Sequence, residues 1–166
     1  MLKIYPVKTD EDIRIAKTLF VEYVEFLKKV LSEYAGVPWL VQYYRDFQEE
    51  TDHLPARYAQ PEGIILIAEY DDRPAGCVAL GKLADNVCEM KRLFVRPENR
   101  RKGIGAALCE ALMGQAIKMG YIHMRLATAL EPPKALYQSL GFKEIAPYRD
   151  VPAEIQNVVH MEVKLE

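Results

Sequence analysis

The sequence has few cysteines and no long apolar run. Its 166 residues include three cysteines, Cys77, Cys88 and Cys109, which lie within apolar segments and form no Cys-x-x-Cys pair. We therefore expect reduced thiols in the core and no disulfide framework. No stretch approaches the ~18 apolar residues that a membrane span requires, and the first residues lack the apolar core of a signal peptide. These absences favour a cytoplasmic protein with no membrane partner.

An excess of either charge is also missing. The chain has 22 Lys and Arg against 24 Asp and Glu, which gives a net charge of -2 at pH 7. No overall basic field steers such a chain onto nucleic acid, so any phosphate binding must come from a local site. The histidines, His53, His123 and His160, are scattered without metal-ligand spacing, so we expect no metal. The length and the 50% apolar content favour one globular domain over residues 1–166.

The hydrophobic pattern changes period along the chain and predicts a mixed α+β fold. Helical spacing predicts helices from residue 10 to before Gly36, over 40–51, from Gly103 to Gly120, and over 132–140. Alternating or continuously apolar runs predict strands at 2–8, 64–70, 74–80, 87–95, 122–127, from 142, and at 157–165. The three central strands should form antiparallel hairpins. The exposed last strand makes a homodimer reasonable.

The segment from Arg100 to Gly105 predicts an anion site. Arg100, Arg101 and Lys102 follow a strand and precede Gly103-Ile104-Gly105, where the next helix starts. A helix start leaves unpaired N–H groups, and glycines let a phosphate approach the backbone. The segment lacks the Gly-Lys-Ser/Thr of a P-loop and the spacing of a dinucleotide fingerprint. The alternative is a surface turn with solvated cations.

Two motifs resemble the GCN5-related N-acetyltransferase (GNAT) superfamily. Arg100-x-x-Gly103-x-Gly105 is similar to its acyl-CoA motif, Gln/Arg-x-x-Gly-x-Gly/Ala. The run from Ala135 through Tyr137 to Gly141-Phe142 resembles a second motif of this family. The order of the predicted elements resembles the family as well. The resemblance implies a mostly antiparallel twisted sheet of about seven strands, flanked by about four helices.

The resemblance also implies an activity. It predicts acetyl transfer from acetyl-CoA to a primary amine of a small molecule or peptide, by direct attack in a ternary complex and without nucleic acid. Acceptor pockets in this fold are built from the first two helices and the loop after Ile145, and nothing in those segments is diagnostic of the amine. Polyamines, amino acids, aminoglycosides and protein N-termini all stay open. An alternative is a non-catalytic acyl-CoA-binding sensor or interaction module.

The same resemblance assigns residues to coenzyme A. The diphosphate would lie on N–H groups around Arg101 to Ala106, and a bulge in strand 87–95 would open an edge for the pantetheine arm. Cys88, Met90 and Phe94 share one parity, which Arg92 breaks, so we expect the bulge there. The predicted cofactor residues are Leu93, Phe94, Val95, Arg100, Arg101, Lys102, Gly103, Ile104, Gly105, Ala106, Thr128 and Tyr137.

Two residues are candidates for catalysis. Glu89 is the candidate general base, acting directly or through water, and its alternative is an ion pair with Lys91 or another cation. Tyr137 is the candidate proton donor to the CoA sulfur, and its alternative is a buried packing aromatic. The family often has Asn where this sequence has Thr128-Ala129-Leu130, so Thr128 is the substitute CoA contact. The aromatic patch at Tyr43–Phe47 either sorts substrates or packs its helix.

Overall fold

One mixed sheet forms the centre of the chain in the computed structural model, which describes residues 1–129 and 131–166, without the side chains of Glu131 and Pro132. Leu130, named above, lies outside the described residues. The elements are β1 (Leu2–Pro6), α1 (Asp10–Val30), η1 (Ser32–Tyr34), α2 (Pro38–Asp52), η2 (Ala56–Tyr58), β2 (Ile64–Tyr70), β3 (Arg73–Ala84), β4 (Val87–Val95), η3 (Pro97–Asn99), α3 (Ile104–Lys118), β5 (His123–Thr128), α4 (Glu131–Ser139), β6 (Lys143–Ile145) and β7 (Val159–Lys164).

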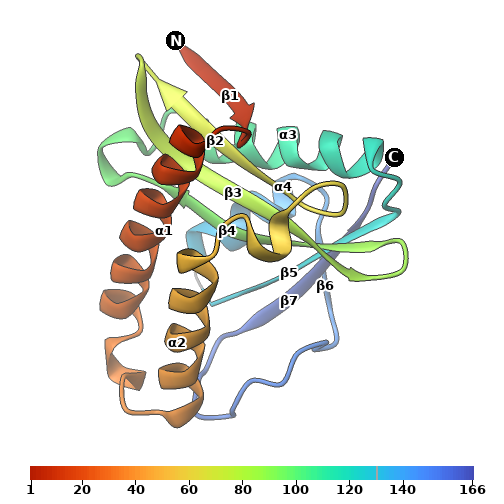
Figure 1. Cartoon of the computed structure of the whole chain (residues 1–166). Helices are drawn as coiled ribbons and strands as arrows, with labels where there is room; N and C mark the ends of the chain where they lie inside the picture. The colour runs from red at the N-terminus through yellow and green to blue at the C-terminus, as the bar shows by residue number, and fades with distance from the viewer. Residues whose placement is uncertain (130) are drawn as a thin grey trace.

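The described strands pair in the order β1-β2-β3-β4-β5-β7-β6. The β4–β5 pair is parallel, and the other neighbours are antiparallel. The predicted mixed fold of seven strands and four helices is therefore confirmed (Figure 1). The expectation of an exposed last strand is wrong, because β7 lies between β5 and β6 and the shorter β6 forms the edge. The reason given for a homodimer is lost with it.

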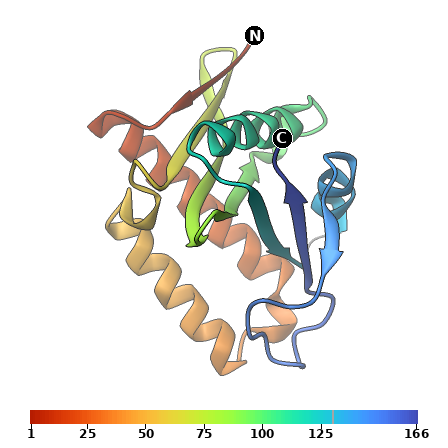
Figure 2. The same cartoon turned by 90° about the vertical axis from the view of Figure 1, so that its right-hand side faces the viewer.

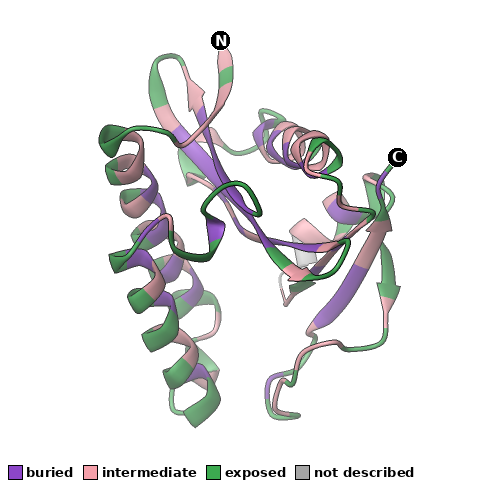
Figure 3. Cartoon of the chain, turned by 45° about the vertical axis from the view of Figure 1, so that its right-hand side comes forward, coloured by how far each residue is buried: buried purple, intermediate pink, exposed green. Residues whose placement is uncertain are grey.

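Helices cover both faces of the sheet. α1 and α2 pack on one face, where Phe20 and Phe47 join Ile67, Cys77 and other sheet residues in one cluster. α3 and α4 pack on the opposite face, where a second cluster includes Leu108, Leu112 and Tyr137 (Figures 1 and 2). The burial pattern follows this layering, since the middle strands are buried and the outer surfaces of the helices are exposed (Figure 3).

The first helix is specified locally. Thr9 caps α1 by accepting a hydrogen bond from the Asp12 N–H, and the Asp12 carboxylate accepts from the Thr9 N–H in return, forming a capping box. Its buried positions, Ala16, Leu19, Phe20, Val24 and Leu27, recur at helical spacing and face the sheet. None of the helices described in residues 1–129 and 131–166 is long and apolar enough to cross a membrane.

A bulge interrupts β4 at the predicted place. Cys77 of β3 pairs with Phe94, whereas Ala79 pairs with Lys91, so β4 has one extra residue between them. Arg92 takes a positive φ of 63° there. The predicted bulge is confirmed. Cys88, Met90 and Phe94 have the same parity in the sequence, but they do not lie on the same face of the sheet. Cys88 and Met90 pack toward α3, and the extra residue turns Phe94 to the α1 and α2 side.

Candidate active site

The start of α3 forms a bare backbone surface. Gly103 is its N-cap, with φ 77°, and Arg101 has φ 63°. The first intrahelical bond runs from the Ala107 N–H to the Gly103 carbonyl at 3.1 Å. The N–H groups of the preceding helical residues, Ile104 to Ala106, have no carbonyl one turn earlier to bond. A Cβ atom at Gly103 would meet nothing within 4 Å, so the space beside the N-cap is open, whereas a Cβ atom at Gly105 would contact Leu136 at 3.5 Å.

The three predicted cations lie in the loop that leads to this surface and are exposed. The Arg100 guanidinium donates from Nε to the Val95 carbonyl at 3.0 Å and lies 4.8 Å from the Phe26 ring centre. The Lys102 ammonium lies 4.5 Å from the ring centre of Tyr70. Arg101 is exposed beside them. The structure therefore brings the predicted phosphate-binding residues to one surface at the positive end of α3.

The strand leading to this surface has an open edge. β4 and β5 pair at only three positions, ending at Glu89 and Arg125, although β4 continues to Val95 and β5 to Thr128. The Arg96 N–H bonds to Ala75 of β3, so by strand alternation the backbone groups of Leu93 and Val95 point toward β5. The two strands have separated there, and these groups face the gap.

Two neighbouring cavities lie at this divergence. The smaller, of about 40 Å³, lies between β4 and β5 and is lined by Leu93, Leu126, Thr128 and Tyr137, among others. The larger, of about 590 Å³, is lined by α1, α2, Arg57 of η2, β4, the end of β5 and the segment 148–158. Lys91, Arg92 and Thr128 line both cavities, so the two cavities are neighbours.

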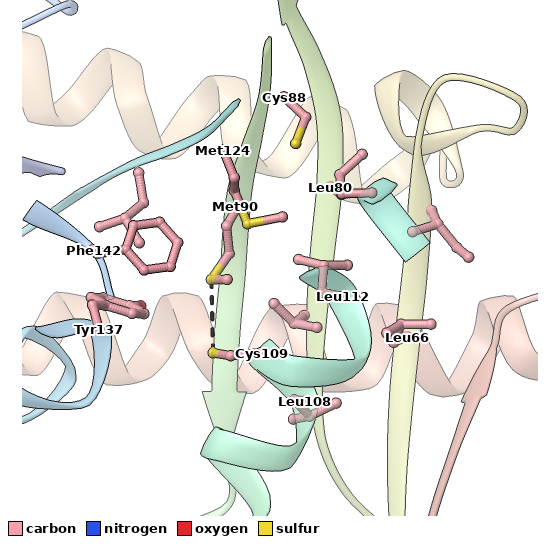
Figure 4. Close-up of a cluster of buried hydrophobic side chains, with 14 of the residues drawn as sticks. Leu66, Leu80, Cys88, Met90, Leu108, Cys109, Leu112, Met124, Tyr137 and Phe142 are labelled. Carbon is pink, nitrogen blue, oxygen red and sulfur yellow. Dashed lines mark hydrogen bonds between the residues drawn. The ribbon is translucent and has the colours of Figure 1, made fainter. Parts of the chain in front are cut away.

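Tyr137 lies where α4 meets the smaller cavity. Its side chain is buried beside Phe142, with ring centres 5.8 Å apart (Figure 4). Burial, followed by the nearby Cys109 and Tyr23, raises the pKa of the Tyr137 phenol well above its ordinary value of 10. The phenol therefore keeps its proton throughout the physiological range and can only donate it in a hydrogen bond or to a stronger base. Packing and proton donation are both compatible with this position.

Glu89 lies at the border of the larger cavity as the centre of an ion cluster. Its buried carboxylate accepts from Tyr148 Oη at 2.8 Å, Arg57 Nη2 at 3.2 Å, Arg149 Nε at 2.7 Å and also Arg149 Nη2. Burial opposes ionisation, but the Arg149 hydrogen bonds, Lys91 and Tyr148 outweigh it and lower the pKa of Glu89 from 4.5 to about 2. Such a carboxylate is a weak base. The geometry favours the ion-pair interpretation over direct proton removal.

A second buried ion pair lies beside this cluster. The Arg92 Nε donates to Glu50 of α2 at 2.9 Å, and both side chains are nearly buried. Arg92 also donates to the Tyr43 hydroxyl at 3.0 Å and lies 3.9 Å from the ring centre of Phe47. Within the aromatic patch of α2, Phe47 packs in the core and Tyr43 lines the cavity. The packing alternative is confirmed for Phe47, and substrate sorting stays a prediction.

Sequence reasoning missed the partners of Glu89. Arg57 lies 32 residues before it, and Tyr148 and Arg149 lie 59 and 60 residues after it, the latter two in an irregular segment beyond β6. One signal was present. Glu89, Lys91 and Arg92 are charged residues in an otherwise apolar strand, and buried charges require partners. Among the described residues no group of three or more His, Cys, Asp or Glu side chains could hold a metal ion.

Comparison with known proteins agrees with the geometry. A family model described as an acetyltransferase (GNAT) domain matches residues 61–144. An uncharacterized N-acetyltransferase of Schizosaccharomyces pombe is 33% identical over 168 residues, which cover 99% of this chain and 95% of that relative. The family match includes β4, the glycine loop and α4, so it spans the elements that form the site.

Solved structures share the whole fold. A GNAT acetyltransferase from Staphylococcus aureus has a TM-score of 0.73 at 19% identity, with 100% of both chains covered. The PaiA N-acetyltransferase of Thermoplasma acidophilum, solved in complex with coenzyme A, has a TM-score of 0.68 at 20% identity, with 99% of both chains covered. With the family match and the fission-yeast relative, they show that this chain belongs to the GNAT superfamily and is an N-acetyltransferase.

Proposed function

We propose that residues 1–166 act as one domain that transfers an acetyl group from acetyl-CoA to a primary amine, by direct attack in a ternary complex. The diphosphate of acetyl-CoA would bind the free N–H groups of Ile104, Gly105 and Ala106, and Arg101 and Lys102 would neutralise its charge. Arg100 would exchange its bond to the Val95 carbonyl for a phosphate contact as the pantetheine arm arrives.

The pantetheine arm would run along the open edge of β4. The backbone groups of Leu93 and Val95 would bond it as a strand bonds its neighbour, with Phe94 between them and Thr128 on the opposite side of the gap. A backbone N–H of this edge would stabilise negative charge on the thioester oxygen during attack. Tyr137 would donate a hydrogen bond to the departing thiolate.

The amine would enter from the larger cavity and must lose a proton, because the pKa of an alkyl ammonium is about 10.4. Lys91 indicates how this site treats an ammonium group. Burial and the positive charge of Arg92, Arg149 and Arg57, only partly offset by Glu89, lower the pKa of Lys91 from 10.5 to about 8. A substrate ammonium beside Lys91 would be pushed in the same direction. Its proton would then pass to water, with Glu89 holding the cations in place rather than removing the proton directly.

The observation that carries this proposal is the alignment of three features along one path. The bare amides of α3, the open edge of β4 and the gap between β4 and β5 follow one another, and the gap adjoins the larger cavity. A donor bound along this path would present its thioester to that cavity from the opposite face of the sheet.

The test is a matched pair of glutamate substitutions at the two ends of α3. Gly103→Glu would place a carboxylate on the phosphate surface, so acetyl-CoA binding measured by calorimetry should be lost. Gly120→Glu adds the same charge at the other end of this helix, at a glycine that also has a positive φ and open space around its Cβ position, and should bind acetyl-CoA as the wild type does. Circular dichroism would confirm that both variants fold. Normal acetyl-CoA binding by Gly103→Glu would refute the assigned site, and binding without turnover of any amine would support the sensor alternative.

A further inference from the structure

The inner end of the larger cavity has more positive than negative charge. Arg57, Lys91 and Arg149 surround a single carboxylate, Glu89. The adjacent Arg92 is already paired with Glu50 at 2.9 Å, so it neither adds to this excess nor removes it. The other carboxylates lining the cavity, Asp46 and Asp150, are exposed. Their charge is screened by water far more than that of the inner groups.

Lys91 is the member of this cluster that Glu89 does not satisfy. A carboxylate has about four acceptor positions, and those of Glu89 are taken by Arg57, Tyr148 and both contacting nitrogens of Arg149. The Lys91 ammonium lies 4.0 Å from the nearer Glu89 oxygen, which is beyond hydrogen-bond distance. Its side chain is only 18% exposed, so little bulk water replaces the missing bond. Burial, followed by the positive charge of Arg92, lowers the pKa of Lys91, and Glu89 offsets this only in part.

The position of Lys91 relates the charge to the proposed reaction. Lys91 lines both the larger cavity and the gap between β4 and β5, where the thioester would lie. An anion bound to Lys91 would therefore be close to the reacting carbonyl. In an α-amino acid only one carbon atom separates the carboxylate from the amine, so a carboxylate on Lys91 would hold the amine near the gap. A polyamine would instead add positive charge to an existing excess.

We propose that the acceptor carries a carboxylate beside its amine, as an α-amino acid does, and that this carboxylate binds the Lys91 ammonium at the inner end of the larger cavity. Arg57 and Arg149, which are 36% and 38% exposed, add to the attraction while they hold Glu89. The inference rests on the proposed acetyl transfer and names the substrate class of that same site.

The test compares acceptors with and without a carboxylate, and reads the change in their ratio between wild type and variants, because an amide also has a less basic amine than its acid. With acetyl-CoA saturating at pH 7, kcat/KM is measured by release of the CoA thiol for α-amino acids, for the matching α-carboxamides and for spermidine. The acids should exceed their amides by roughly tenfold to hundredfold, the range expected for a hydrogen bond to a charged group. Lys91→Met should remove this preference, Lys91→Arg should retain much of it, and Lys82→Met, which removes an exposed lysine outside the cavity, should leave it unchanged.

A second readout does not depend on turnover. The CoA-bound protein is titrated by calorimetry with N-acetyl amino acids and with their amides, and the acids should bind more tightly in the wild type but not in Lys91→Met. The inference is overturned if acids and amides have equal kcat/KM and equal affinity in the wild type. It is also overturned if Lys91→Met keeps the preference for acids. If spermidine or the amides are acetylated as well as the acids, the acetyl transfer stands and only the acceptor class is wrong. Failure of the wild type to bind acetyl-CoA would overturn the proposed function itself.

Discussion

Replacing Glu89 by Gln should remove a large part of the stability of the fold. The carboxylate is 2% exposed, and its pKa is about 2 in the folded chain against an ordinary 4.5. At about 1.4 kcal/mol per pKa unit, this difference corresponds to roughly 3 kcal/mol of stabilisation at neutral pH. The value agrees with the ~3–5 kcal/mol typically lost when one partner of a buried ion pair is removed, since Gln would leave Arg57, Lys91 and Arg149 without a counter-charge.

The assay is urea denaturation of wild type and Glu89→Gln at several pH values. Because the folded-state pKa is depressed, the stabilisation is fully present above pH 4.5 and is lost as the pH falls toward 2. The difference in unfolding free energy should therefore be constant from pH 7 to about 5 and shrink below that. Glu62→Gln is the control, since this glutamate is 61% exposed and pairs with Lys82; its effect should stay within about 0.5 kcal/mol.

The same variant separates the two interpretations of Glu89. An ion-pair role predicts a lowered urea midpoint. A direct base role predicts a kcat that is about 10² to 10⁴ times lower in a protein of unchanged stability. Equal urea midpoints for wild type and Glu89→Gln at pH 7, with equal slopes, would refute the ion-cluster reasoning.

Two further substitutions test the gap and the edge that borders it. Tyr137→Phe should keep the buried ring but lower kcat by roughly 10²-fold if the phenol donates a proton. Tyr121→Phe, at a partly buried tyrosine that bonds the Glu62 carbonyl outside the two cavities, should leave kcat unchanged. An unchanged kcat in Tyr137→Phe would leave only the packing role. Gly76→Ala should destabilise the fold by about 1–3 kcal/mol, because the new Cβ would lie 2.5 Å from the Phe94 carbonyl oxygen. Gly114→Ala, in open space within α3, should stabilise the fold by about 1 kcal/mol. Thermal melting compares the two variants. A Gly76→Ala protein as stable as wild type would contradict the close approach of β3 and β4.

The elements and the glycine loop could be predicted because their signals are local. The apolar runs at 64–70 and 87–95 gave the bounds of β2 and β4 as the structure has them. The loop from Arg100 to Gly105 was predictable because a strand, a glycine turn and a helix start are consecutive in the chain. The order of the last strands in the sheet could not be predicted. An alternating pattern such as that of β7 shows which side chains share a face, but not which strands lie beside β7.

The ion cluster could not be predicted from local pattern. Its members come from η2, β4 and the segment after β6, and their approach depends on how β7 and β6 are placed beside β5. The sequence does show that Glu89 and Lys91 need partners. Which cations come close to Glu89 depends on contacts between segments that are distant in the sequence. The larger cavity could not be predicted from local pattern either, since it is lined by segments from six separate parts of the chain.

The bulge at Arg92 links the donor and acceptor sides of the site. In a regular strand, Lys91 and Arg92 would point to opposite faces of the sheet. The extra residue lets both face the α2 side, where Arg92 binds Glu50 and Lys91 lines the larger cavity. A positive φ at a non-glycine residue costs about 1–3 kcal/mol, which the buried Arg92–Glu50 pair and the Phe47 contact can offset. Beyond the bulge, β4 no longer pairs with β5 and its backbone faces the gap. The same irregularity thus adjoins the edge proposed for the thioester and the cavity proposed for the acceptor, so changes at Arg92 should alter donor and acceptor binding together.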